Sequence, residues 1–128
     1  MKEGHCLCGA VRFAWEDGAE RWCDHCHCES CRRQTASAFT TFVGITNGRW
    51  HWCGEEPTAY ASSVGVVRRF CPRCGTPVSF ENERWPDETH FYAALLVDHA
   101  DLVPERHDHW EERVRWVELG DTLPRREG

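Results

Sequence analysis

Residues 71–75 read Cys-Pro-Arg-Cys-Gly, and residues 6–9 read Cys-Leu-Cys-Gly. Each motif brings two thiols close together in sequence, and a glycine follows the second cysteine. Glycine tolerates the positive φ that a backbone adopts when its N–H groups turn toward ligated sulfur. A structural zinc ion takes four protein ligands, so the two pairs predict one shared site that ties the first strand to a later hairpin. The alternative is that these cysteines are isolated buried thiols.

A third cluster, Cys26-x-Cys28-x-x-Cys31, offers three thiols within six residues. Three protein ligands and one open position are the arrangement of a catalytic zinc site. A metal there would hold a substrate thiol as a thiolate or polarise a carbonyl group. The sequence therefore predicts a second zinc ion with a chemical role, held less firmly and less fully occupied than the first.

Cys23 leaves other interpretations of this cluster open. The run Cys23–Cys31 contains four cysteines and could close an all-thiolate structural site by itself. His25 and His27 could also compete for the fourth position. With a closed site, the protein would be a non-catalytic zinc-binding adaptor. A thiol-binding protein that keeps an open site but has no turnover is a further alternative.

Length and charge limit the function classes. A chain of 128 residues predicts a single domain over residues 1–128. The formal charge of −6 argues against nucleic-acid binding, although Arg32, Arg33, Arg68 and Arg69 could form a local basic patch. No stretch approaches the roughly 18 apolar residues of a membrane span, and the first residues lack a secretory signal. We therefore expect a cytoplasmic protein, in which clustered cysteines are metal ligands rather than disulfides.

Short β-type segments separated by Gly, Pro, Asn and Asp dominate the rest of the chain. Strands are expected at residues 11–15, 39–43, 50–53, 58–62, 64–70, 77–80 and 90–97. Only residues 29–38 are expected to be helical, for a turn or two. This pattern predicts a mainly β fold with little helix. Cys53 lies at the end of one expected strand and is predicted to be a buried, inert thiol.

Three ordered cysteine motifs, together with their flanking residues, resemble the glutathione-dependent formaldehyde-activating enzyme family. Centromere protein V belongs to the same superfamily. The resemblance is carried by residues 4–13, 26–33 and 70–77, and it extends into 104–107 and 116–124. It thus covers nearly the whole chain and is far more specific than a single Cys-x-x-Cys.

The resemblance implies an Mss4-like fold of stacked antiparallel sheets. The structural zinc ligands would be Cys6, Cys8, Cys71 and Cys74, and the catalytic zinc ligands Cys26, Cys28 and Cys31. The family pattern does not require Cys23, and Ala36 stands where many relatives carry glycine. The implied activity is that of a carbon–sulfur lyase, and the family's founding reaction joins formaldehyde and glutathione into S-hydroxymethylglutathione. We therefore expect a zinc-dependent enzyme with two Zn²⁺ per chain and a small thiol, such as glutathione, as its partner.

Overall fold

A computed structural model describes residues 1–128. The elements are β1 (Lys2–His5), β2 (Arg12–Trp15), β3 (Glu20–Cys26), α1 (Glu29–Thr35), β4 (Thr40–Thr46), β5 (Trp50–Trp52), β6 (Thr58–Ser63), β7 (Val66–Phe70), β8 (Pro77–Asn82), β9 (Glu88–Tyr92), η1 (Ala93–Leu95), β10 (His107–Asp108) and η2 (Trp110–Glu112). None of the helices combines the length and the apolar character that crossing a membrane requires.

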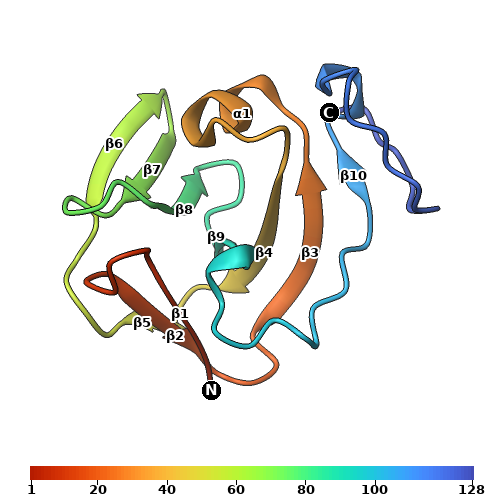
Figure 1. Ribbon diagram of the computed structural model, residues 1–128. Coiled ribbons are helices and arrows are strands. Elements are labelled where there is room, and N and C mark those ends of the chain that lie inside the picture. Colours follow the sequence, from red (N-terminus) through yellow and green to blue (C-terminus); the bar gives the residue numbers. More distant parts are fainter.

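The strands form two sheets (Figure 1). The smaller sheet has the order β1-β2-β5, and the larger has the order β10-β3-β4-β9-β8-β7-β6. The strand pairs are antiparallel except β10 with β3, which is parallel. This arrangement confirms the prediction of a mainly β fold with stacked sheets and little helix. The strand expected at residues 90–97 ends at Tyr92, where the chain continues as the short 3-10 helix η1.

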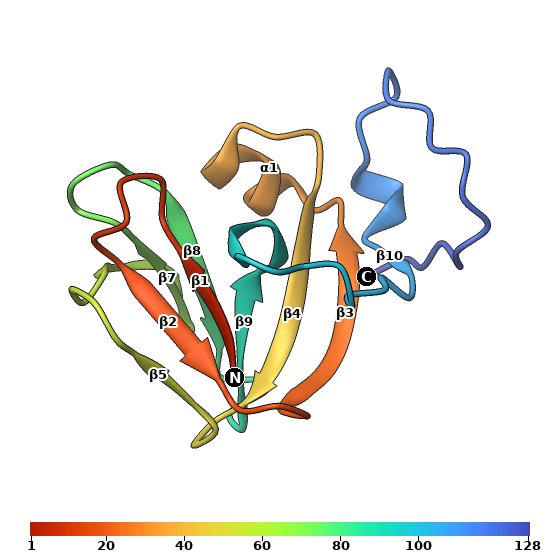
Figure 2. The same cartoon turned by 60° about the horizontal axis from the view of Figure 1, so that its bottom comes forward.

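The smaller sheet lies against one face of the larger sheet (Figure 2), and the main hydrophobic core lies between them. Phe13 and Trp15 of β2 project from the smaller sheet onto Phe91 of β9, with ring centroids 4.6 and 5.6 Å apart. All three side chains are fully buried. Stacked and tilted aromatic pairs of this kind stabilise a core beyond the effect of the area they bury. Packing of β2 on β9 therefore fixes the smaller sheet on one face of the larger one.

The opposite face of the larger sheet carries a second, smaller cluster. Successive side chains of a strand point to opposite faces, so Val43 and Phe91 enter the main core whereas Phe42 and Tyr92 do not. Phe42 and Tyr92 are paired across β4 and β9, and they pack with Cys31 of α1. This second face therefore carries the residues that surround the three-cysteine cluster.

Cys53 does not have the environment that its sequence position suggested. The strand β5 ends at Trp52, so Cys53 lies in the connection that follows, and it is exposed. The prediction of a buried thiol at this position is therefore wrong. Cys53 belongs to neither of the thiol clusters described below.

Ala36 ends the helix α1 in the left-handed region, with φ of 57° and ψ of 26°. This conformation is unfavourable for a residue with a Cβ and favours glycine. We therefore expect Ala36→Gly to raise the free energy of unfolding by about 0.5–1 kcal/mol. Urea denaturation measures the change. Ala38→Gly is the control, because Ala38 does not have a positive φ. Glycine there only increases the conformational entropy of the unfolded chain and should lower the free energy of unfolding. Equal changes in the two variants would contradict the explanation.

Candidate metal centres

The two cysteine pairs meet in space. Cys6 and Cys8 follow β1, whereas Cys71 and Cys74 lie between β7 and β8. Their four sulfur atoms all lie within 4.8 Å of one another, with Cys6 and Cys8 3.6 Å apart and Cys8 and Cys71 3.8 Å apart. A tetrahedron with Zn–S bonds of about 2.3 Å has edges of about 3.8 Å. The four thiols therefore fit a zinc ion.

The backbone around this cluster turns toward the sulfur atoms. Gly9 and Gly75 have φ of 82° and 79°, which confirms the conformational role expected of them. The N–H of Val11 donates to Sγ of Cys6 at 3.3 Å, and Cys6 is 1% exposed. Hydrogen bonds of this kind orient ligand sulfur atoms and stabilise them as thiolates.

The three thiols of the second cluster also gather at one point. Strand β3 leads into α1 (Figure 1). Cys26 ends β3, Cys28 is the N-cap of α1, and Cys31 lies in its first turn. Their sulfur atoms lie within 4.8 Å of one another, with Cys26 and Cys31 3.9 Å apart, so they also fit zinc. The N–H of Cys31 donates to Sγ of Cys28 at 3.3 Å. Hydrogen bonds from Cys26 and Cys28, followed by the charge of Arg68, lower the pKa of Cys31 to about 3.

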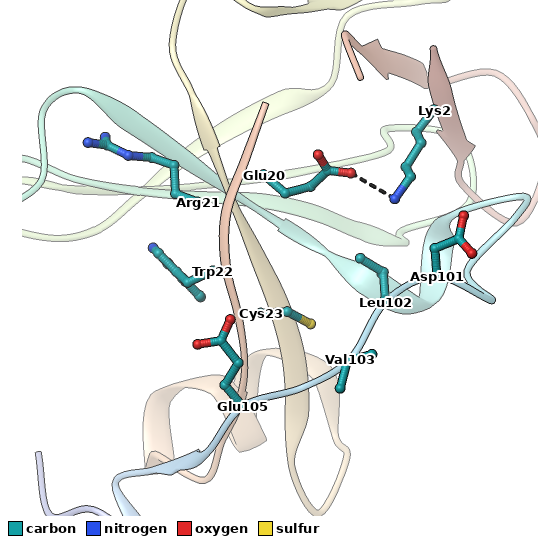
Figure 3. A pocket seen from close by; sticks show the side chains of 9 residues that line it. All are labelled: Lys2, Glu20, Arg21, Trp22, Cys23, Asp101, Leu102, Val103 and Glu105. Atoms are coloured by element: carbon teal, nitrogen blue, oxygen red, sulfur yellow. Dashed lines mark ion pairs between the residues drawn. The ribbon is translucent and has the colours of Figure 1, made fainter. Parts of the chain in front are cut away.

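Cys23 does not join this cluster. It precedes Cys26 by three residues within β3, so its side chain points to the other face of the sheet and packs in the main core. There it lines a cavity of about 350 Å³ with residues that include Lys2, Glu20 and Leu102 (Figure 3). Burial raises the pKa of the Cys23 thiol to about 11. The structure therefore does not bring Cys23 to the three thiols, as the alternative of a closed four-cysteine site would require.

The two histidines near the cluster make their contacts elsewhere. Nε2 of His27 lies 2.8 Å from Nδ1 of His107, whose Nε2 lies 3.0 Å from both carboxylate oxygens of Asp121. His25 forms a 2.8 Å hydrogen bond with the hydroxyl of Thr41. Burial lowers the pKa of His27 to about 4, so the ring is neutral at pH 7. Neither histidine groups with the three thiols as a ligand. Instead, His27 holds the C-terminal segment against the Cys26–Cys28 loop.

Arg68 of β7 approaches the cluster from across the larger sheet. It pairs with Phe80 of β8, and Phe80 pairs with His90 of β9, so Arg68 lies on the face that also bears Tyr92. Its two terminal nitrogens lie 3.8 and 3.7 Å from Sγ of Cys31. The sequence singled out Arg68 only as part of a basic patch. Locating it here requires the register of three strands.

Three of the four arginines that could have formed a local basic patch make separate contacts. Arg68 and Arg69 are consecutive residues of one strand and point to opposite faces, and Arg69 pairs with Glu81 at 3.3 Å. Arg33 pairs with Glu29 at 2.9 Å on the surface of α1. Arg33, Arg68 and Arg69 therefore serve separate local contacts.

Comparisons with known proteins agree with this geometry. The family model described as "Glutathione-dependent formaldehyde-activating enzyme" matches residues 1–113. A Halomonas elongata protein named a putative glutathione-dependent formaldehyde-activating enzyme is 27% identical over 127 residues, which cover 93% of this chain and 81% of that protein. A Schizosaccharomyces pombe protein named an uncharacterized lyase is 34% identical over 87 residues, which cover 61% of this chain and 56% of that protein.

A crystal structure of a Rhodobacter sphaeroides protein shares the fold, with a TM-score of 0.62 and 20% identity. The match covers 97% of this chain and 99% of that one. The family model spans both cysteine pairs and the three-thiol cluster. This chain belongs to the glutathione-dependent formaldehyde-activating enzyme family.

Proposed function

We propose that the protein is a zinc-dependent carbon–sulfur lyase that acts on a small thiol adduct, with formation of S-hydroxymethylglutathione from formaldehyde and glutathione as the model reaction. The observation that carries the proposal is the incomplete ligand set of the second cluster. Three thiols converge there, Cys23 lies on the opposite face, and His27 is bonded to His107. Family membership and the names of both relatives support a lyase-type enzyme.

A zinc ion held by Cys26, Cys28 and Cys31 would supply a Lewis acid with one position free for a sulfur or oxygen atom of the substrate. The four-thiol cluster is assigned the structural zinc ion. It joins the loop after β1 to the β7–β8 connection and so fixes the position of β7. We place the reaction in a reducing compartment, the cytoplasm, because all seven ligand thiols must remain reduced to bind metal.

Polar groups beside the three thiols suit the handling of a polar substrate. Thr40 lies opposite Cys26 in the β3–β4 register, and its hydroxyl is buried without a hydrogen-bond partner. A buried hydroxyl of this kind is satisfied when a ligand supplies the missing partner. The hydroxyl of Tyr92 donates to Oε1 of Gln34 at 2.6 Å. We assign Thr40 the hydrogen bond to the substrate and Tyr92 a supporting position next to it.

The test is the rate of formaldehyde consumption with a panel of small thiols that includes glutathione. The zinc-loaded protein should accelerate consumption with at least one thiol, and removal of the second metal ion should abolish the acceleration. The protein-free reaction is the reference, because thiols and formaldehyde combine without a catalyst. No acceleration with any thiol would reject the formaldehyde reaction. Thiol binding without acceleration would favour the alternative of a thiol-binding protein.

A further inference from the structure

Arg68 is a buried arginine without a carboxylate partner. Only 5% of its surface is exposed. Its hydrogen bonds go to a cysteine sulfur and a tyrosine hydroxyl, and it takes part in no ion pair with Asp or Glu. A buried guanidinium is strongly destabilising unless a negative group lies next to it. The only candidate in contact with it is the sulfur of Cys31.

Three contacts fix the guanidinium in this position. Both terminal nitrogens face the single sulfur of Cys31, at 3.8 and 3.7 Å. One of them also donates to the hydroxyl of Tyr92 at 3.4 Å. The guanidinium carbon lies 4.8 Å from the centroid of the Phe80 ring, a cation–π arrangement. The side chain therefore has one orientation, and its charge is aimed at the three-thiol cluster.

The charges of the two clusters explain why only one of them needs such a partner. Three thiolates and one Zn²⁺ leave a net charge of about −1, and a fourth sulfur ligand would add another negative charge. The four-thiol cluster reaches the surface at Cys8, which is exposed. Arg73, which lies between Cys71 and Cys74 in the sequence, pairs with Glu55 at 2.7 Å. Solvent can screen the charge of that cluster at Cys8, whereas Cys31, the thiol that faces Arg68, is only 3% exposed.

We propose that Arg68 is a positioning residue of the three-thiol centre. Its fixed positive charge lies against Sγ of Cys31 and offsets the repulsion among the three clustered sulfur ligands, and it thereby determines how firmly the cluster retains its metal. The inference rests on the proposed assignment of a metal to this cluster, but it does not depend on which substrate is used. Nothing in the pattern of cysteines alone would identify this role.

The test measures metal retention with Zn²⁺ and Co²⁺ as probes. In R68M, a colorimetric chelator should remove the second Zn²⁺ at a concentration about 10- to 100-fold lower than in the unaltered protein, the range found when a group supporting a metal ligand is lost. The first Zn²⁺ should leave as before. The Co²⁺ form should show altered sulfur-to-metal charge-transfer absorption. R69M is the matched control, because Arg69 neighbours Arg68 but points to the other face, and it should behave like the unaltered protein.

Rescue separates the effect of charge from that of packing. R68K keeps a positive charge on a flexible stem and should recover part of the retention, whereas the uncharged R68Q should not. Unchanged retention in R68M or R68Q would overturn the proposal. If neither R68M nor R68Q folds, metal retention by a folded R68K protein supports the role of the charge. Loss of the second metal ion from R68K would count against it. Because the readout is metal retention, it is independent of the lyase assay. Loss of retention in a protein without turnover would uphold this inference and reject only the proposed reaction.

Discussion

Replacing Cys71 with serine should remove one metal ion per chain and either prevent folding or lower the melting temperature by more than about 15 °C. Cys71 is fully buried in the main core, and its sulfur is one of four that join the β1–β2 region to the β7–β8 hairpin. Structural zinc binds small domains with an apparent free energy of about 10–16 kcal/mol. A domain of ordinary stability has only about 5–15 kcal/mol to lose. Losing this site should therefore remove most of the stability.

Metal analysis and thermal denaturation measure both effects. Cys53→Ser is the matched control, because Cys53 is exposed and belongs to neither cluster. It should retain both metal ions and the melting temperature of the unaltered protein. A Cys71→Ser protein that keeps two metal ions and melts normally would contradict the structural role of this site.

Cys31→Ser should also lose one metal ion per chain. Unlike Cys71→Ser, it should stay folded but have almost no catalytic activity. Serine is a poor zinc ligand, so the second cluster would offer only two thiols. Metal-ion catalysis supplies several kcal/mol of transition-state stabilisation, so the rate should fall by about 10³-fold or more. The fold should survive, because Cys31 packs in the small second cluster and not in the main core.

The matched control for this variant is Cys23→Ser. Cys23 is buried to a similar extent but lies on the other face of β3, in the main core. The substitution should leave both metal ions and the catalytic rate intact and lower stability by about 1–3 kcal/mol, because it buries a hydroxyl. Loss of the second metal ion from Cys23→Ser, or full activity in Cys31→Ser, would contradict the three-thiol assignment. Activity is measured as formaldehyde consumption with the best thiol of the panel.

The cysteine clusters could be predicted because the members of each motif are close in sequence. Cys-x-Cys and Cys-x-x-Cys spacings are local, and the structure brings together the same sets of four and three that the spacing suggested. Placing Cys23 on the opposite face requires the strand β3, which was not predicted from the sequence. Glu20–Cys26 lacks a simple apolar–polar alternation, since Cys23 enters the core while Asp24 is buried on the second face. Once the strand is known, a spacing of three excludes Cys23 from the cluster.

The position of Arg68 beside Cys31 could not be predicted from the sequence. Alternation along β7 separates it from Arg69, but only the register of β7 on β8 and of β8 on β9 brings it to Cys31. These pairings depend on long-range packing of the sheet. The same is true of the contact between His27 and His107, which are 80 residues apart. The clustering of the cysteines can therefore be predicted from local spacing, whereas the contacts of Arg68 and His107 depend on the assembled fold.

The pairing of β10 with β3 implies that the two cysteine clusters are completed at different times during synthesis. Cys26, Cys28 and Cys31 leave the ribosome before Cys71 and Cys74, yet the His107 that anchors the loop between Cys26 and Cys28 follows Cys74 by 33 positions. At a translation rate of about 5–20 residues per second, this interval lasts roughly 2–7 s. The four-thiol cluster can close during that time. The three thiols are thus synthesised first, and their loop gains the His107 contact last. We therefore expect the edge strand β10 to be missing from β3 during that interval.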